Sequence, residues 1–207
     1  MTYKLIYLNH QLALDYPELG KPLTVDFQQS RYAVKNNLKK ELLAKAVGIK
    51  KNIFPSICDI TAGFGQDAYL LYMLGCEVKL VERSEIIAKL LQDGLFRANC
   101  DMELFIGEAK DYLNDLLKTK IQPDVIYFDP IFPDKNASAL SQKSARILRA
   151  IAGKDEDSAE VFELALKAAK KRVVVKRGLY SNFISAKYDK PDIIYKGKCI
   201  RFDVYLC

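Results

Sequence analysis

The chain has 207 residues, of which 50% are hydrophobic and 28% are charged, and its formal net charge is +6; these values are typical of one soluble globular domain. No apolar stretch approaches the roughly 18 residues that span a bilayer, and the apolar run near the N-terminus is interrupted at residues 9–11, so we expect a cytoplasmic protein with no membrane partner and no signal peptide. Five widely spaced cysteines without a C-x-x-C, and a single histidine, His10, argue against a disulfide framework, a metal site and a Ser-His-Asp triad.

The first third of the chain predicts short strands followed by a helix. Residues 4–8 and 22–27 read as strands separated by Pro/Gly turns, so residues 1–35 are interpreted as an N-terminal extension with short strands. Residues 36–48 read as an amphipathic helix that ends at Gly48, a plausible C-cap.

From there on, strand and helix patterns alternate. The strands are predicted at 56–60, 77–82, 102–107, 124–129, 172–177, 192–196 and 200–206. The helices between them are predicted at 66–74, 84–98 (with Ser84 as N-cap), 108–119, 138–150 and 156–171. Cys58, Cys76, Tyr69, Tyr72 and residues 70–74 are expected in the core. The pattern predicts an α/β, Rossmann-like fold: a mostly parallel sheet with helices on both faces and an antiparallel C-terminal hairpin at one edge.

Three of these strands end in an acid: Asp59, Glu82 and Asp129. In open α/β sheets, ligands bind beyond the carboxyl ends of the strands. The sequence therefore predicts one site where the three acids converge. A lone Asp-Pro would be read as an ordinary turn, and this convergence favours a functional interpretation of Asp129.

The run DITAGFGQDA predicts the cofactor half of that site. Gly63 and Gly65 allow a tight turn and close approach of a ligand, and Glu82 follows at a spacing suited to binding ribose hydroxyls. Both NAD and S-adenosylmethionine carry such a ribose. Asp59 and Asp67 add negative charge that would repel a pyrophosphate but attract the ammonium group of an amino acid, so the residues favour S-adenosylmethionine.

The stretch VIYFDPIFPDK, residues 125–135, predicts the reaction half. An aromatic amine is a poor nucleophile because its lone pair is delocalised into the ring. The Asp129 carboxylate and the Pro130 carbonyl can accept its two hydrogens and localise the lone pair, and Phe132 can stack on the base. This chemistry needs neither a metal nor a histidine.

A basic sector follows this strand. Residues 135–177 contain eleven basic and five acidic residues, while the rest of the chain is neutral. Such a sector suits a polyanion such as RNA, although solvated helix faces would give the same count. Lys135, Lys176, Arg177 and Arg31 are the candidate RNA contacts, with structural ion pairs as the alternative for Lys176 and Arg177.

Several blocks in order, including LAKAVGIK, DITAGFGQDAYLLYMLGCEV, VERSEIIAKLLQDGL, VIYFDPIFPDK and KGKCIRFDVY, resemble the bacterial ribosomal RNA small subunit methyltransferase J family. The resemblance implies an S-adenosylmethionine-dependent methyltransferase domain over residues 36–207. It also implies methylation of the N2 amino group of one guanine in 16S rRNA, with naked rRNA or the 30S subunit as partner, and we expect a monomer. The runner-up is an adenine-N6 or cytosine-N4 methyltransferase, and a different class is a non-catalytic RNA-binding assembly protein.

The resemblance also places cofactor contacts on named positions: Gln66, Asp67, Glu82, Arg83, Ala109, Lys110 and Asp129. Gln66 replaces an arginine that is usual in the family, and Ala109-Lys110 replaces two small hydroxyl residues. KNNLKKE, residues 35–41, stands where the family has a glycine-rich run. Side-chain hydrogen bonds at these positions are therefore expected to differ from those of the family.

Overall fold

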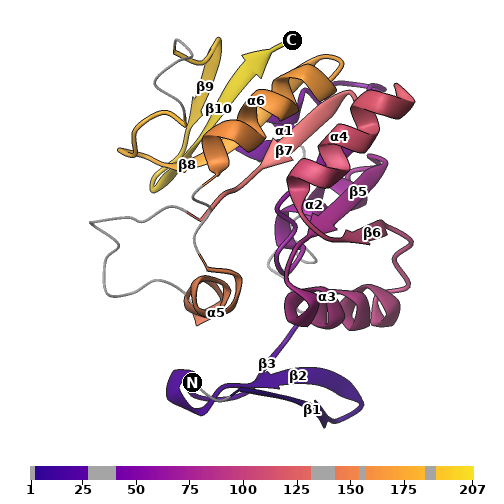
Figure 1. The fold of residues 1–207 in the computed structure, drawn as a ribbon, viewed down its shortest axis with the longest axis vertical. Helices are drawn as coiled ribbons and strands as arrows, with labels where there is room; N and C mark the ends of the chain where they lie inside the picture. The colour runs from indigo at the N-terminus through magenta and orange to yellow at the C-terminus, as the bar shows by residue number, and fades with distance from the viewer. Residues whose placement is uncertain (1–2, 28–40, 132–142, 154–156, 185–189) are drawn as a thin grey trace.

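The computed structural model describes residues 3–27, 41–131, 143–153, 157–184 and 190–207 (Figure 1). A seven-stranded sheet forms its centre, in the order β6-β5-β4-β7-β8-β10-β9. These strands are β4 (Ile57–Asp59), β5 (Val78–Glu82), β6 (Glu103–Ile106), β7 (Val125–Phe128), β8 (Arg172–Gly178), β9 (Ile193–Lys196) and β10 (Ile200–Leu206). Strands β4 to β8 pair in parallel, and β10 is antiparallel to both β8 and β9. The predicted Rossmann-like sheet with an antiparallel C-terminal edge is confirmed.

Helices cover both faces of this sheet, because alternate residues of the buried strands point to opposite sides. Ile57 and Tyr127 belong to one hydrophobic core, whereas their neighbours Cys58 and Ile126 belong to the other. The first core includes buried residues of α1 (Leu42–Val47), α2 (Gln66–Met73) and α3 (Glu85–Arg97), and the second includes those of α4 (Ala109–Thr119) and α6 (Ser158–Ala168). Among the described residues, no helix has the length and apolarity that crossing a membrane requires.

Most predicted boundaries and caps agree with the structure. The Ser84 hydroxyl caps α3 by accepting a hydrogen bond from Ile87 N, and Gly48 ends α1 with φ +87°. Cys58 and Cys76 are buried as expected. The predicted core range 70–74 was wrong at Met73, which is 50% exposed.

Three predicted helices differ from the observed ones by more than two residues at one end. The helix predicted at 36–48 is α1, which begins at Leu42 after an extended Glu41, and residues 36–40, with most of the KNNLKKE run, lie outside the described part of the chain. The helix predicted at 138–150 is α5 (Lys143–Ala152), and residues 138–142 lie outside the described part of the chain. The helix predicted at 156–171 ends earlier, because the backbone is extended at Ala169, and the amides of Lys170 and Lys171 donate to Pro123 O and Asp124 O. These bonds carry the chain directly into β8.

The N-terminal part forms a separate three-stranded antiparallel sheet of β1 (Lys4–Leu8), β2 (Gln11–Asp15) and β3 (Leu23–Thr24). Sequence analysis missed β2. Asn9 and His10 connect β1 to β2 and have φ of 48° and 63°. Positive φ at both positions is typical of the two-residue turns that join the strands of a β-hairpin. The only histidine is thus a turn residue in this hairpin.

Helix α3 holds this small sheet against the rest of the molecule (Figure 1). The Leu12 amide donates to Asp93 Oδ2 over 3.2 Å, and the Arg97 guanidinium donates to Val25 O. Gly94 lies between them on α3, where an added Cβ would come within 2.6 Å of a Val25 methyl and 2.9 Å of its carbonyl oxygen. The backbone of α3 at Gly94 therefore packs directly against the backbone of Val25, just after β3, with no side chain between them.

Candidate active site

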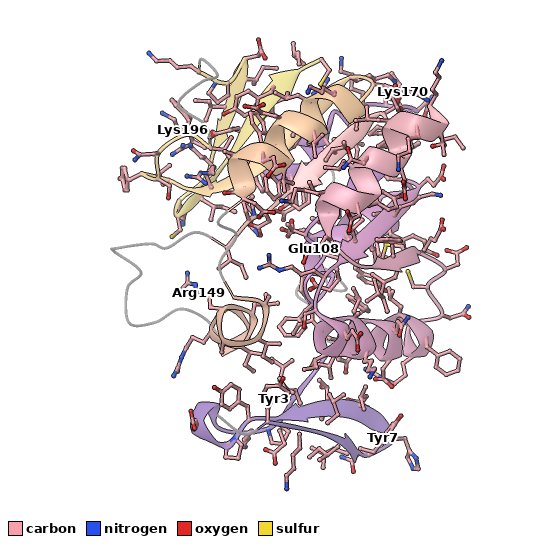
Figure 2. All side chains as sticks on the ribbon, viewed as in Figure 1. Tyr3, Tyr7, Glu108, Arg149, Lys170 and Lys196 are labelled. Atoms are coloured by element: carbon pink, nitrogen blue, oxygen red, sulfur yellow. The ribbon has the colours of Figure 1, made fainter. Side chains whose placement is uncertain are left out.

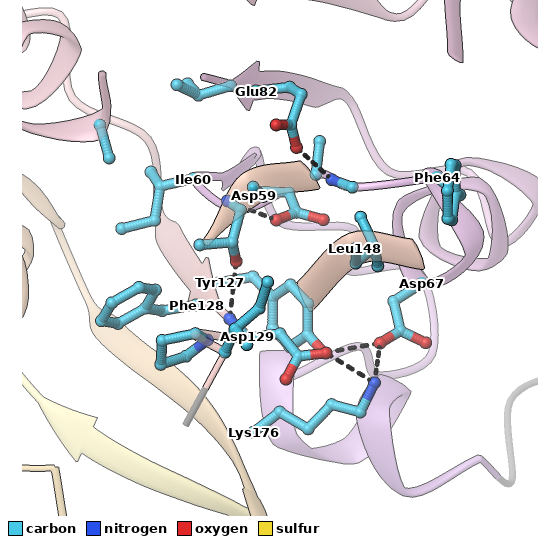
Figure 3. A pocket seen from close by; sticks show the side chains of 18 of the residues that line it. Asp59, Ile60, Phe64, Asp67, Glu82, Tyr127, Phe128, Asp129, Leu148 and Lys176 are labelled. Carbon is cyan, nitrogen blue, oxygen red and sulfur yellow. Dashed lines mark hydrogen bonds and ion pairs between the residues drawn. The ribbon is translucent and has the colours of Figure 1, made fainter. Parts of the chain in front are cut away.

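A cavity of about 900 Å³ opens beyond the carboxyl ends of β4, β5, β7 and β8 (Figure 3). Its volume lies within the usual range for pockets that bind a small molecule, roughly 300–1,000 Å³. The three acids predicted to converge, Asp59, Glu82 and Asp129, all line it. The topology brings them together because β4 lies between β5 and β7 in the sheet.

Asp59 forms the floor of the cavity at the end of β4. Its side chain is almost fully buried, and Oδ1 accepts a hydrogen bond from Thr61 N over 3.0 Å. Burial raises the pKa of Asp59 to about 8, despite the opposing effect of the Thr61 hydrogen bond. The carboxyl group is therefore largely protonated at neutral pH, and it can ionise when a cation binds next to it.

The two glycines after β4 have different roles. Gly63 has φ +55° and lines the cavity, so its amide is part of the cavity wall. Gly65 has φ +71° and is buried away from the cavity; an added Cβ there would lie 2.6 Å from Leu91 Cδ1 and 3.2 Å from the Phe27 ring. Gly65 thus permits the turn into α2 and its close packing.

Glu82 ends β5 and is held by backbone amides. Oε2 accepts from Gly63 N and Oε1 accepts from Ser84 N, each over 2.8 Å. The carboxylate is 5% exposed and lines the cavity in an orientation fixed by the two chain segments that flank it. The next residue, Arg83, also lines the cavity and donates to Ala152 O at the end of α5.

Asp129 follows β7 and faces the cavity from the neighbouring strand end. Its amide donates to the Thr61 hydroxyl over 2.7 Å, which ties the end of β7 to the loop that follows β4. Pro130 is buried and lines the cavity beside it, while Phe132 lies outside the described residues.

Lys176 of β8 reaches between two carboxylates of this site. Its Nζ lies 2.8 Å from Asp129 Oδ2 and 2.7 Å from Asp67 Oδ2 (Figure 3). Burial lowers the pKa of Lys176, but Asp129 and Asp67 outweigh this effect and hold it above the usual range of lysine. The same Asp67 oxygen accepts from the Tyr127 hydroxyl over 2.7 Å, so a charged network joins α2, β7 and β8.

The predicted RNA contacts have different surroundings from those expected. Lys176 forms the ion pairs described above, which is the structural alternative that the sequence left open. Arg177 is 5% exposed and donates to Asn182 O. Arg31 and Lys135 lie outside the described residues.

The remaining predicted cofactor residues divide into two groups. Gln66 and Ala109 line the cavity, Gln66 as an exposed residue at the start of α2. Lys110 is not in the cavity wall; its Nζ lies 3.2 Å from Asp157 and 3.1 Å from Glu160, so it links α4 to the start of α6.

Sequence reasoning missed two walls of the cavity. Leu148 and Arg149 of α5 form one, and Thr24 of β3 and Asp26, two residues further on, contribute to another. Helix α5 lies between the two sheets in Figure 1 and contacts both α3 and the 3₁₀ helix η1 (Pro17–Leu19). No local sequence pattern reports such contacts between distant segments, so only the fold could reveal them.

Comparisons with known proteins agree with this geometry. The family described as putative SAM-dependent methyltransferase matches residues 1–207. A protein named ribosomal RNA small subunit methyltransferase J from Nitrosococcus oceani is 41% identical, over 99% of this chain and 84% of its own length. A protein of the same name from Thioalkalivibrio sulfidiphilus is 44% identical, over 94% of this chain and 80% of its own length.

A solved structure is also similar. The crystal structure of an S-adenosylmethionine-dependent methyltransferase from Neisseria gonorrhoeae has a TM-score of 0.70 and 31% sequence identity, over 95% of this chain and 79% of that one.

Proposed function

We propose that this chain, which belongs to the ribosomal RNA small subunit methyltransferase J family of S-adenosylmethionine-dependent methyltransferases, methylates the exocyclic N2 amino group of a guanine in 16S rRNA. The observation that carries the proposal is the position of Asp129 and Pro130, which follow β7 and line the same cavity as Asp59 and Glu82. The activity and its rRNA substrate rest on the names of the relatives. The choice of guanine N2 rests on the family resemblance.

The cavity has the donor and acceptor set that S-adenosylmethionine requires. We assign the two ribose hydroxyls to Glu82, whose oxygens the amides of Gly63 and Ser84 already orient. The ammonium group of the methionine moiety is assigned to Asp59, because Asp67 is paired with Lys176 and Tyr127. When bound, S-adenosylmethionine supplies a methyl group on a sulfonium, which is already a strong electrophile.

The acceptor half of the reaction is assigned to Asp129 and Pro130. The Asp129 carboxylate and the Pro130 carbonyl oxygen accept the two hydrogens of the guanine amino group. These bonds localise the nitrogen lone pair and stabilise the positive charge that develops on nitrogen as the N–C bond forms. The S–C bond to the methyl group would break at the same time, and its electron pair would stay on sulfur as a neutral thioether. Asp129 then takes up the proton that the nitrogen releases.

Lys176 serves this step as a positioning residue. Its ammonium group holds one oxygen of Asp129 and offsets the charge of Asp67, so the Asp129 carboxylate is held in place beside a second, half-buried carboxylate. A fixed acceptor does not have to reorient during the reaction.

The experiment is methyl transfer from radiolabelled S-adenosylmethionine to 30S particles from cells that lack this protein. We expect label in 16S rRNA on a single guanine, mapped by mass spectrometry as an N2 modification that is absent from those cells. Label on an adenine or cytosine amino group would refute the assigned base. If the protein binds cofactor and RNA but transfers no methyl group, the proposed activity is refuted and the result favours a non-catalytic RNA-binding assembly protein. A substrate in the ribosome would place the protein in the cytoplasm, and we propose that it acts as a monomer.

A further inference from the structure

The turn that begins with the last residue of β8, residues 178–182, is held in place by two buried arginines. Arg201 of β10 donates from Nη1 to Gly178 O over 3.1 Å and to Leu179 O over 2.8 Å. Arg177 donates to Asn182 O at the other end of the turn. Backbone bonds from Leu179 N to Cys199 O and from Ser181 N to Gly178 O complete the turn.

The arginine that holds the turn is itself fixed by a buried acid. Asp203 is fully buried, and its two oxygens accept from Nε and Nη2 of Arg201 over 2.8 and 3.1 Å. The Arg201 guanidinium also lies 5.1 Å from the centre of the Phe183 ring. Burying an ion pair is costly for folding, so this pair is weak evidence for added stability. What it does in the structure is fix the guanidinium group that holds the turn.

That geometry presents one aromatic side chain to solvent. Tyr180 is 93% exposed, whereas Arg177 and Arg201, which pair across β8 and β10 at the base of the turn, are each 5% exposed. Its neighbours on the turn, Gly178 and Ser181, line the active-site cavity, as does Cys199 opposite them. Tyr180 therefore stands at the rim of the cavity, on a backbone that is ordered in advance.

We propose that Tyr180 is a contact for the RNA substrate and provides the ring on which a base next to the target nucleotide stacks. The inference rests on the proposed function. An exposed ring offers a flat apolar surface that any base can use, and a preformed turn lowers the entropy lost on binding. Arg177, which the sequence predicted as a phosphate contact, acts on RNA together with Arg201 through the turn that the two residues hold.

The test compares Tyr180→Ala with Tyr180→Phe, and with Phe96→Ala as a matched control. Phe96 is 85% exposed on α3 and is not among the residues that line the cavity. Because both side chains project into solvent, neither alanine variant should alter thermal unfolding or the affinity for S-adenosylmethionine. Binding of 30S particles that lack the modification, and methyl transfer to them, are measured separately.

Tyr180→Ala is expected to lower both the affinity for 30S particles and kcat/KM by about 5- to 150-fold, the range set by stacking of one base. Tyr180→Phe keeps the ring and should stay within about 2-fold of the unsubstituted protein, as should Phe96→Ala. Unchanged particle affinity in Tyr180→Ala, or an equal loss in Tyr180→Phe, would overturn the proposal. If the unsubstituted protein binds particles but transfers no methyl group, the proposed reaction fails, and the binding data still decide the role of Tyr180.

Discussion

The ammonium group of Lys176 lies 2.8 Å from Asp129 Oδ2, so the acid assigned to the amino group of guanine has a fixed cationic partner on the next strand. The same ammonium lies 2.7 Å from Asp67 Oδ2. Without it, two carboxylates would face each other next to the buried Asp59. Lys176 thus reduces the repulsion among Asp59, Asp67 and Asp129, and the Asp129 carboxylate can serve as a hydrogen-bond acceptor.

Lys176→Met is expected to lower kcat at least about tenfold at pH 7.5, because Asp129 loses both its orientation and its neutralising charge. Loss of the cation raises the pKa values of the carboxylates around it, so part of the activity should return as the pH increases. The kcat-versus-pH profile checks this. A uniform loss at every pH, or a loss in KM alone, would contradict the positioning role.

Asp129→Ala removes the carboxylate acceptor and is expected to lower kcat about 100- to 1,000-fold, the range for loss of one group that stabilises transition-state charge. Asp129→Asn keeps an oxygen acceptor and should retain more activity. Lys176 keeps Asp67 as a partner in both variants, so thermal unfolding and cofactor binding should change little. Near-normal turnover in Asp129→Ala would remove this residue from the mechanism.

The affinity for S-adenosylmethionine should increase several-fold per pH unit between pH 6 and 7.5. The folded-state pKa of Asp59 is raised to about 8, so the free protein holds a proton there in this window. The ammonium group of S-adenosylmethionine favours the ionised form of Asp59. Binding therefore releases the proton from Asp59, and the affinity increases with pH. Calorimetry in buffers of different ionisation enthalpy measures that release. Asp59→Asn should weaken binding and abolish the pH dependence, and a flat profile in the unsubstituted protein would disprove the assignment.

Gly94→Ala tests the contact between α3 and the N-terminal sheet. Alanine normally stabilises a helix interior by about 1 kcal/mol relative to glycine. Here its Cβ would lie 2.9 Å from Val25 O, and overpacking of this kind costs roughly 1–3 kcal/mol. We expect a net fall in melting temperature and weaker cofactor binding, because Thr24 and Asp26 line the cavity. Lys89→Ala, at an exposed position of the same helix, is the control.

Arg149 is a better candidate for a direct phosphate contact than the buried Arg177. It is exposed, lines the cavity and projects from α5, whereas Lys170 lies at the far end of the molecule (Figure 2). Arg149→Glu should weaken binding to 30S particles. It should also make the plot of log affinity against log salt concentration less steep, by about the amount that corresponds to one or more lost phosphate contacts. Lys170→Glu should leave the slope nearly unchanged, and equal effects of the two substitutions would indicate nonspecific charge.

The sequence predicted the sheet and the convergence of its acidic strand ends, because parallel strands separated by helices leave few possible topologies. Asp59, Glu82 and Asp129 each end a buried apolar run, and that pattern is local. The contacts of Lys176 and Arg177 were harder to predict. A basic residue at a strand end looks the same in sequence whether it meets phosphate, a carboxylate or a carbonyl group.

Strand β2 and the contribution of α5 to the cavity could not be predicted, because local sequence patterns do not report either of them. The turn at Asn9 and His10 uses positive φ without any glycine, so the hairpin lacked its strongest local signal. Thr24, Asp26 and Arg149 reach the cavity only because α3 and α5 bring distant segments together.

The hydrogen bond from Asp129 N to the Thr61 hydroxyl, with the one from Ile60 N to Tyr127 O, fastens the donor and acceptor sides of the reaction to each other. Helix α5, which forms another wall of the cavity, is joined to the end of β5 by the hydrogen bond from Arg83 to Ala152 O. The relative position of cofactor and acceptor is thus set by bonds between neighbouring strand ends, before either substrate binds.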